Sequence, residues 1–228
     1  MTLGLLFDLD GTLADTDPVH FRAFNTLLRE FGRSLTHEHY THSVLGGANA
    51  LIMQRLFPDL DRDRHAELAD RKEALFRSHS GHLEPLEGLR ELLAEAAQHD
   101  VKVGVVTNAP RANAEHMLQV LGLEHLLPTV VVAEEIAHSK PHPLPYLTGL
   151  ERLGCPADRT IAFEDSTSGV TAASAAGLFT VAIKTSLNAD ALLTAGADMV
   201  IDDYRDPGLL ALVRRAIAGG VIERAGRS

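Results

Sequence analysis

The sequence predicts an α/β fold, with a Rossmann-like, doubly wound parallel sheet as the core and an inserted α-helical domain. Short apolar segments recur without the alternation of a half-exposed strand, which is typical of strands buried on both faces of a parallel sheet. Amphipathic segments lie between most of them and end at glycine, a frequent helix terminator. Repeated β-α units of this kind favour a right-handed, doubly wound sheet.

The individual strands and core helices can be placed by their residue patterns. Strands are predicted at residues 3–7, 101–106, 129–132, 160–163, 180–183 and 199–201. Helices are predicted at residues 86–97, 111–121, 144–153 and 168–176, and each of the last three is followed by a glycine. From residue 86 to residue 183 these predicted helices and strands alternate along the chain.

The alternation of predicted strands and helices is interrupted once. The first two strands are separated by far more residues than one crossover helix needs. Asp17 followed by Pro18 is typical of a helix N-cap and first turn, and an apolar helical face runs from there to Gly32. Further helical patterns cover residues 48–57 and 64–76. We therefore expect a catalytic core at 1–14 and 82–228 and a helical cap domain at 15–81.

The amino-acid composition argues against several kinds of binding partner and structural framework. The 31 acidic residues outnumber the 21 basic ones, for a net charge of −10, which disfavours nucleic acid and anionic membranes as partners. The single cysteine excludes an internal disulfide framework. No Lys or Arg precedes Arg22, and no apolar run approaches the roughly 18 residues of a membrane span. We expect a cytoplasmic protein, a monomer or weak dimer, that binds a small molecule.

Two carboxylates directly follow the first predicted strand, in the sequence FDLDGT at residues 7–12. Ligands of open α/β sheets bind at the carboxyl ends of the strands, so Asp8 and Asp10 occupy a favourable position for chemistry. Asp and Gly also dominate turns for conformational reasons. Taken alone, this motif therefore fits a turn about as well as a site.

Three further strand ends carry polar residues. Thr107 and Asn108 follow the second strand, Lys140 lies before a proline in the loop after the third, and Glu164 and Asp165 follow the fourth. Each has a simpler interpretation: a helix cap, a solvated charge and an acidic loop, respectively. Because parallel strands share one carboxyl edge, all of these groups are expected to converge on a single point.

With this set of motifs the chain resembles the haloacid dehalogenase superfamily of phosphotransferases over essentially its whole length. Residues 7–12 resemble the first motif, Thr107 and Asn108 the second, Lys140 the third, and the pair Glu164 and Asp165 the fourth. Residues 11–20 and 164–169 are similar to the subgroup with a helical cap after the first motif. That subgroup contains β-phosphoglucomutase, sugar phosphatases and phosphoglycolate phosphatase.

The resemblance implies an Mg²⁺-dependent hydrolysis of a small phosphate ester through an aspartyl-phosphate. Asp8 would be the nucleophile, which needs cations around the anionic phosphoryl group. Mg²⁺ would be held by Asp8, the backbone carbonyl of Asp10 and Asp165, with help from Glu164. Asp10 would act as general acid and base.

The remaining core motif residues would act around the phosphoryl group. Lys140 would hold Asp8 ionised, and Thr107 would donate a hydrogen bond to a phosphoryl oxygen. Asn108 would bind substrate beside them.

Two other chemistries compete with this hypothesis. A haloacid dehalogenase proper uses an aspartate nucleophile without a metal and does not need Asp10 or Asp165. A phosphoacceptor receiver domain also combines Asp, Thr, Lys and Mg²⁺, but the resemblance places its phosphoacceptor on the third strand and gives it no cap. The position of Asp8 after the first strand favours the phosphatase.

Within the predicted cap, His20, Asn49 and Lys72 occupy positions at which mutase-like members contact substrate. Each also fits an ordinary surface position on a helix. The mutase-like pattern Gly-x-x-Arg, whose Arg grips a second phosphate, is replaced by GGAN at residues 46–49. A neutral amide at Asn49 favours simple hydrolysis, with a β-phosphoglucomutase-like mutase as the alternative. The cap would also serve as a lid that excludes water.

Overall fold

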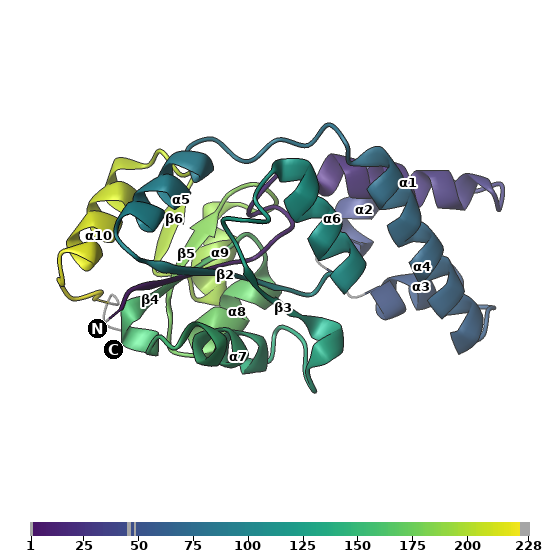
Figure 1. Cartoon of the computed structure of the whole chain (residues 1–228). Helices are drawn as coiled ribbons and strands as arrows, with labels where there is room; N and C mark the ends of the chain where they lie inside the picture. The colour runs from purple at the N-terminus through teal and green to yellow at the C-terminus, as the bar shows by residue number, and fades with distance from the viewer. Residues whose placement is uncertain (1, 45–46, 48, 224–228) are drawn as a thin grey trace. The chain divides into compact units, whose positions relative to one another are not determined.

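A computed structural model describes residues 2–44, 47 and 49–223 (Figure 1). The chain forms two compact units. One comprises Met1–Asp15 and Glu84–Ser228, and the other comprises Thr16–Leu83. Among the described residues, no helix has both the length and the apolar character that crossing a membrane requires. Each unit is described separately below.

The first unit contains a six-stranded sheet in which every pairing is parallel. Its strands are β1 (Gly4–Phe7), β2 (Lys102–Thr107), β3 (Thr129–Val132), β4 (Thr160–Glu164), β5 (Phe179–Ile183) and β6 (Met199–Ile201). Their order is β3-β2-β1-β4-β5-β6, so the chain leaves β1 toward one edge and later continues from β4 toward the other. The predicted Rossmann-like sheet is confirmed, and its topological switch point lies between β1 and β4.

Helices cover both faces of this sheet (Figure 1). They are α5 (Leu89–Gln98), α6 (Arg111–Leu121), α7 (Leu144–Leu153), α8 (Thr167–Ala175), α9 (Ala189–Ala195) and α10 (Pro207–Ile217). Figure 1 shows α7 and α8 on one side of the strands and α5 and α10 on the other. The predicted ends of α6 and α7 are confirmed, because Gly122 and Gly154 adopt the left-handed conformation that closes a helix.

The prediction for α5 was wrong at its start. The sequence pattern began the helix at Leu86, whereas the helix begins at Leu89, because Gly88 adopts a left-handed conformation with φ of 82°. A Cβ at Gly88 would lie 2.9 Å from the backbone of Tyr204 and Arg205. This glycine therefore allows a close backbone approach that delays the helix.

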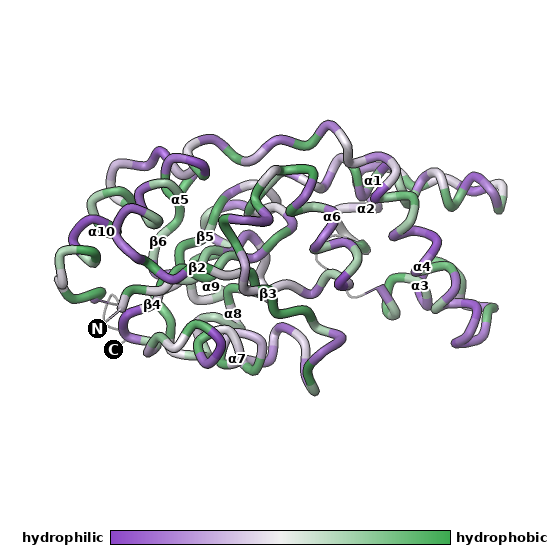
Figure 2. The backbone as a smooth tube through the Cα atoms, viewed as in Figure 1, coloured by the Kyte–Doolittle hydropathy of each residue, from purple (hydrophilic) through white to green (hydrophobic). Residues whose placement is uncertain are grey.

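The central strands are buried on both faces, as the unbroken apolar segments predicted. Every residue of β1, β4 and β5 is buried, and Figure 2 colours β5 mainly as hydrophobic. On one face, Leu6 and Val106 pack with Tyr146 and the small residues of α8. On the other face, the rings of Phe7 and Phe163 stack 4.6 Å apart. This packing fixes the two strand ends that carry Asp8 and Glu164.

The second unit, Thr16–Leu83, consists of α1 (Asp17–Arg29), α2 (His37–Ser43), α3 (Asn49–Leu56) and α4 (Arg62–His79). Asp17 was predicted as the N-cap of α1, but it is the first helical residue and Thr16 takes the cap position. The four helices enclose their own apolar cluster, which includes Phe24, Leu28 and Tyr40. Gly46 and Ala48 of the segment GGAN at residues 46–49 lie outside the described residues. That this unit functions as a cap is our proposal.

Candidate active site

Asp8 stands at the first position after β1, where the chain turns sharply. Its backbone amide still donates to the carbonyl of Phe163 at 2.9 Å, so the sheet holds the residue in place. Gly11 then adopts a left-handed conformation with φ of 69°. The Thr185 hydroxyl donates to the Gly11 carbonyl at 2.5 Å. The turn that the motif FDLDGT suggested is thus present, and it carries the first carboxylate of the site.

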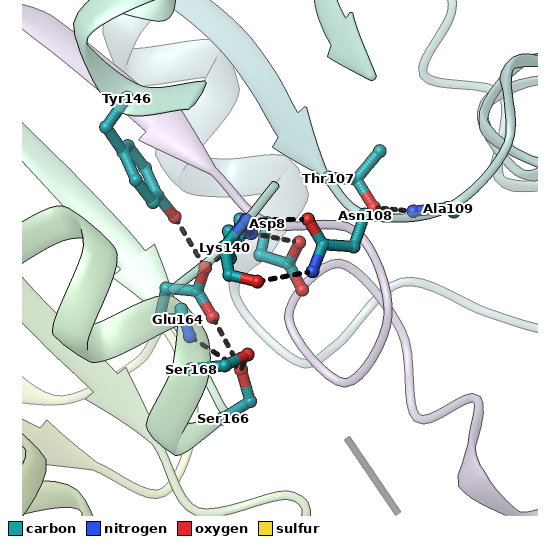
Figure 3. Close-up of polar contacts among 10 residues, drawn as sticks. Asp8, Thr107, Asn108, Ala109, Lys140, Tyr146, Glu164, Ser166 and Ser168 are labelled. Carbon is teal, nitrogen blue, oxygen red and sulfur yellow. Dashed lines mark hydrogen bonds and ion pairs between the residues drawn. The ribbon is translucent and has the colours of Figure 1, made fainter. Parts of the chain in front are cut away.

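Lys140 joins the carboxylates at the ends of β1 and β4 (Figure 3). Its Nζ lies 2.6 Å from Oδ1 of Asp8 and 2.5 Å from Oε1 of Glu164. Only 6% of the lysine is exposed. The alternative of a solvated surface charge is therefore wrong, since Lys140 is a buried cation shared by two carboxylates.

Glu164 is completely buried, which excludes the acidic-loop interpretation. Its Oε1 accepts from Tyr146 at 2.6 Å in addition to Lys140, and its Oε2 accepts from Ser166 at 3.3 Å. A Cβ on Gly169 would lie 1.9 Å from this carboxylate. The glycine in the first turn of α8 therefore makes room for the buried carboxylate, and three protein donors satisfy it.

Asp165 completes a group of three carboxylates. The Ser186 hydroxyl donates to its Oδ2 at 2.6 Å, and a Cβ on Gly11 would lie 2.1 Å from the same oxygen. One oxygen each from Asp8, Glu164 and Asp165 can be chosen so that all lie within 4.8 Å of one another. Closely spaced carboxylate oxygens are the donor set that hard divalent cations prefer.

The residues after β2 lie beside the lysine. The Thr107 hydroxyl accepts from the backbone amide of Ala109 at 3.0 Å, whereas α6 begins only at Arg111 with Pro110 as its N-cap. Thr107 is therefore not the cap of this helix. Asn108 accepts from the Lys140 backbone amide at 3.1 Å and donates to the Lys140 carbonyl at 3.4 Å (Figure 3). The Asn108 side chain thus holds the lysine backbone, and its predicted contact with substrate stays a prediction.

Burial dominates the electrostatics of the site. It raises the pKa of Asp8 from 3.8 to about 7, a rise that Lys140 offsets in part and that Glu164 and Asp10 reinforce. Burial acts in the opposite direction on Lys140, but Asp8 and Glu164 together outweigh it and raise the lysine pKa. Lys140 was predicted to hold Asp8 ionised; it acts in that direction by lowering the pKa of Asp8, but burial raises that pKa by more.

Asp10 lies two residues after Asp8 in the same turn, and its backbone bridges to Ala14. Its side chain is partly exposed, unlike those of Asp8, Glu164 and Asp165. Among the described residues, the three-carboxylate group does not include the Asp10 carboxylate. This difference separates the Asp10 carboxylate from the carboxylates that are candidate metal ligands.

The three residues predicted to bind substrate in the helical unit lie close together there. His20 Nδ1 is 3.1 Å from Lys72 Nζ, and the ammonium donates to Glu73 at 2.7 Å. The Asn49 amide donates to the same glutamate oxygen at 2.6 Å. Lys72 is only 3% exposed, so the surface-helix interpretation is wrong for it. His20, Asn49, Lys72 and Glu73 form what we term the cap cluster.

Glu73 is the member of the cap cluster that sequence reasoning missed. Burial by itself would raise its pKa, but Lys72, His20 and the Asn49 amide outweigh burial and lower it. Glu73 therefore carries a negative charge that balances the charge of Lys72. Two core residues, Tyr146 and Ser186, were also missed, because each reads as an ordinary helix or loop residue in the sequence.

Known proteins resemble this chain over most of its length. Residues 5–183 match the family model described as haloacid dehalogenase-like hydrolase. The fructose-1-phosphate phosphatase of Escherichia coli is 32% identical over 184 residues, which are 79% of this chain and 96% of that protein. A phosphoglycolate phosphatase of Xylella fastidiosa is 33% identical over 178 residues, 76% of each chain.

A solved structure agrees with these sequence relatives. The CbbY protein of Rhodobacter sphaeroides, in a mutant form bound to xylulose 1,5-bisphosphate, has a TM-score of 0.79 and 26% identity. The match covers 92% of this chain and 98% of that one. The resemblance drawn from the motifs is confirmed, and the chain belongs to the haloacid dehalogenase-like hydrolase family.

Proposed function

We propose that this protein is an Mg²⁺-dependent phosphatase that hydrolyses a small phosphate ester through an aspartyl-phosphate on Asp8. One observation carries the proposal. A carboxylate at the end of β1 is paired with a buried lysine at 2.6 Å, and two further carboxylates lie beside it at the end of β4. A nucleophile, a fixed cation and a divalent-metal donor set therefore occur together at the switch point of the sheet.

The donor set fits a hard divalent cation. Asp8 and Asp165 offer carboxylate oxygens, and the backbone carbonyl of Asp10 is the proposed third ligand. Glu164 is better suited to contact the metal through a water molecule, because Lys140, Tyr146 and Ser166 already donate to its oxygens. A bound Mg²⁺ would supply positive charge to the phosphoryl oxygens.

The first chemical step uses the residues around Asp8. Its carboxylate oxygen attacks phosphorus, and the new O–P bond forms as the bond from phosphorus to the ester oxygen breaks. Lys140 keeps the carboxylate oriented. Thr107 accepts from Ala109 and can direct its own hydroxyl hydrogen toward a phosphoryl oxygen.

Asp10 moves the protons in both steps. In its protonated form it gives a proton to the leaving alkoxide, so that the alcohol departs neutral. It then takes a proton from the water that attacks the aspartyl-phosphate. That attack breaks the bond between Asp8 and phosphorus, releases inorganic phosphate and restores both carboxyl groups to their starting states.

The relatives and the cap cluster support a proposal for the substrate class. The two named phosphatase relatives act on fructose 1-phosphate and phosphoglycolate by their names. We propose a sugar phosphate or phosphoglycolate-like ester for this chain, with His20, Asn49 and Lys72 recognising the part remote from phosphorus. The cap cluster combines hydrogen-bond donors and acceptors, which suits a hydroxylated group.

A phosphate-release screen tests the proposed function. Sugar phosphates, phosphoglycolate and nucleotides would each be offered with Mg²⁺ and with excess chelator. We expect at least one sugar phosphate or phosphoglycolate to be hydrolysed, and only with the metal. Metal-independent activity would instead favour a dehalogenase-type site, and lasting phosphorylation by small phosphodonors without turnover would favour a phosphoacceptor regulator.

A second prediction separates the phosphatase from a phosphosugar mutase. A mutase must hold a bisphosphate by both ends, and an Arg grips phosphate through two charge-assisted hydrogen bonds. Here Asn49 is neutral, and Lys72 is paired with Glu73. We therefore expect β-glucose 1-phosphate, primed with β-glucose 1,6-bisphosphate, to yield inorganic phosphate or nothing, without efficient formation of glucose 6-phosphate.

A coupled glucose 6-phosphate dehydrogenase assay, run beside a phosphate assay, measures both products. Robust formation of glucose 6-phosphate by the unmodified protein would contradict the phosphatase assignment. In that case Lys72 or another cation must hold the second phosphate despite its pairing. The Asn49→Arg variant provides the comparison, because it restores the guanidinium of the mutase-like pattern.

A further inference from the structure

Tyr146 places its ring beside the Lys140 ammonium and its hydroxyl on an acceptor that the lysine also uses, although nothing in the proposed chemistry uses the tyrosine. It lies on α7 with no exposed surface, packed with Leu6, Val106 and Leu150. The phenol oxygen donates to Oε1 of Glu164 at 2.6 Å, the same oxygen that accepts from Lys140 (Figure 3). The lysine Nζ also lies over the tyrosine ring, 5.2 Å from its centroid.

The hydroxyl matters because Lys140 is shared between two carboxylates. Its Nζ is about equally close to Asp8 and Glu164, at 2.6 and 2.5 Å. Among buried side chains, a carboxylate oxygen that has fewer donors attracts the ammonium more strongly. By donating to Oε1, the tyrosine satisfies part of the hydrogen-bonding capacity of Glu164, and this limits the pull of Glu164 on the lysine.

The ring acts on the same ammonium from another direction. An ammonium is attracted to the face of an aromatic ring within about 6 Å of its centroid. Asn108 meanwhile holds the Lys140 backbone through two hydrogen bonds. The backbone and the charged end of the lysine are thus positioned separately, the first by Asn108 and the second by Glu164 and Tyr146.

We propose that Tyr146 is a positioning residue that keeps the Lys140 ammonium on Asp8 during phosphoryl transfer. The inference rests on the proposed function for its kinetic consequence, but the position of the ammonium is a property of the resting protein. Without the hydroxyl, the ammonium moves toward Glu164 and orients Asp8 less well. The loss then falls on the chemical step and spares substrate and metal binding.

The test uses Tyr146→Phe, which removes one oxygen and keeps the ring. We expect kcat to fall about tenfold, the scale of one hydrogen bond to a charged group, with KM and the Mg²⁺ concentration for half-maximal activity unchanged. In a Lys140→Met background the same substitution should cause no further fall, because the group through which it acts is gone. A further fall of the same size in that background would overturn the proposal.

Tyr204→Phe is the matched control. It also deletes one buried phenol hydroxyl, which donates to the Thr12 carbonyl at 3.0 Å. It is expected to lower the melting temperature by a similar amount without the kcat loss of Tyr146→Phe. If Tyr146→Phe lowers only the melting temperature, its role is structural and the proposal is wrong.

A second measurement, an NMR spectrum of the lysine ammonium groups, does not depend on enzymatic activity. The chain has only four lysines, Lys72, Lys102, Lys140 and Lys184. In protein labelled with ¹⁵N at lysine Nζ, comparison with Lys140→Met identifies the Lys140 ammonium signal. Tyr146→Phe should shift that signal and leave the other three in place, whereas an unshifted signal overturns the proposal. If the unmodified protein releases no phosphate from any ester, the proposed function fails, while this spectrum still decides the role of Tyr146.

Discussion

Asp8→Asn is expected to lower phosphate release by roughly 10³-fold or more while the protein stays folded, because an amide cannot replace the attacking carboxylate. The substitution keeps the shape of the side chain. An asparagine can also present its carbonyl oxygen to Lys140, which retains its second ion pair with Glu164. The rate is measured by phosphate release, and folding by thermal unfolding.

The same variant is also expected to change how the stability of the protein depends on pH. Burial raises the pKa of Asp8 to about 7 in the folded protein, against 3.8 when it is exposed. The folded state therefore binds this proton more tightly, and the contribution of Asp8 to the free energy of unfolding falls as the pH rises from about 4 to 7. Lys140, Glu164 and Asp10 are the charged groups that act on it. In the absence of metal, the melting temperature of Asp8→Asn should improve relative to the unmodified protein across this range.

The matched control is Asp190→Asn, at an exposed position in the first turn of α9. It makes the same chemical change away from the site and should leave phosphate release unchanged. Near-normal activity in Asp8→Asn would show that Asp8 does not attack phosphorus. A melting temperature that falls relative to the unmodified protein as the pH rises would contradict the assigned effect of burial.

The sheet was predictable because strands buried on both faces consist of nearly continuous apolar segments, which can be recognised in the sequence. Strands β3 and β6 were predicted to the residue, since each is a short β-branched or apolar segment with a clear boundary: Pro128 precedes β3, and Asp198 and Asp202 flank β6. Helix α2 was missed because its seven residues, HEHYTHS, contain one apolar side chain and begin from a Thr36 cap. Helix α10 has the same Asp-Pro start as α1, at Asp206 and Pro207, so its first turn is visible in the sequence although the helix is not among those predicted.

The site was predictable to the extent that it depends on strand ends. Asp8, Lys140 and Glu164 follow three different strands, and a parallel sheet brings such positions to one edge. The contacts of Tyr146 and Ser186 could not be predicted in this way. Each depends on how a helix or loop packs across many intervening residues, and a tyrosine on the apolar face of α7 has the same pattern as any core residue.

The last prediction separates Asp10 from the metal ligands. We expect Asp10→Asn to lower kcat by roughly 10² to 10⁴-fold, the usual contribution of general acid and base catalysis, and to leave Mg²⁺ affinity almost unchanged. Its proposed metal contact is the backbone carbonyl, which the substitution keeps. The carboxylates of Asp8, Glu164 and Asp165 form a group to which the Asp10 side chain does not belong among the described residues.

Asp165→Ala should act on the metal itself. Its carboxylate is buried and held by Ser186 at 2.6 Å, so the substitution removes a fixed oxygen from the donor set. We expect the Mg²⁺ dissociation constant, measured by calorimetric titration of the resting protein, to rise at least about tenfold, since even partners outside the ligand shell contribute 10 to 100-fold. Saturating Mg²⁺ should then restore part of the activity of Asp165→Ala but none of that lost in Asp10→Asn. If both variants lose Mg²⁺ affinity equally, the two aspartates do not divide their roles as proposed.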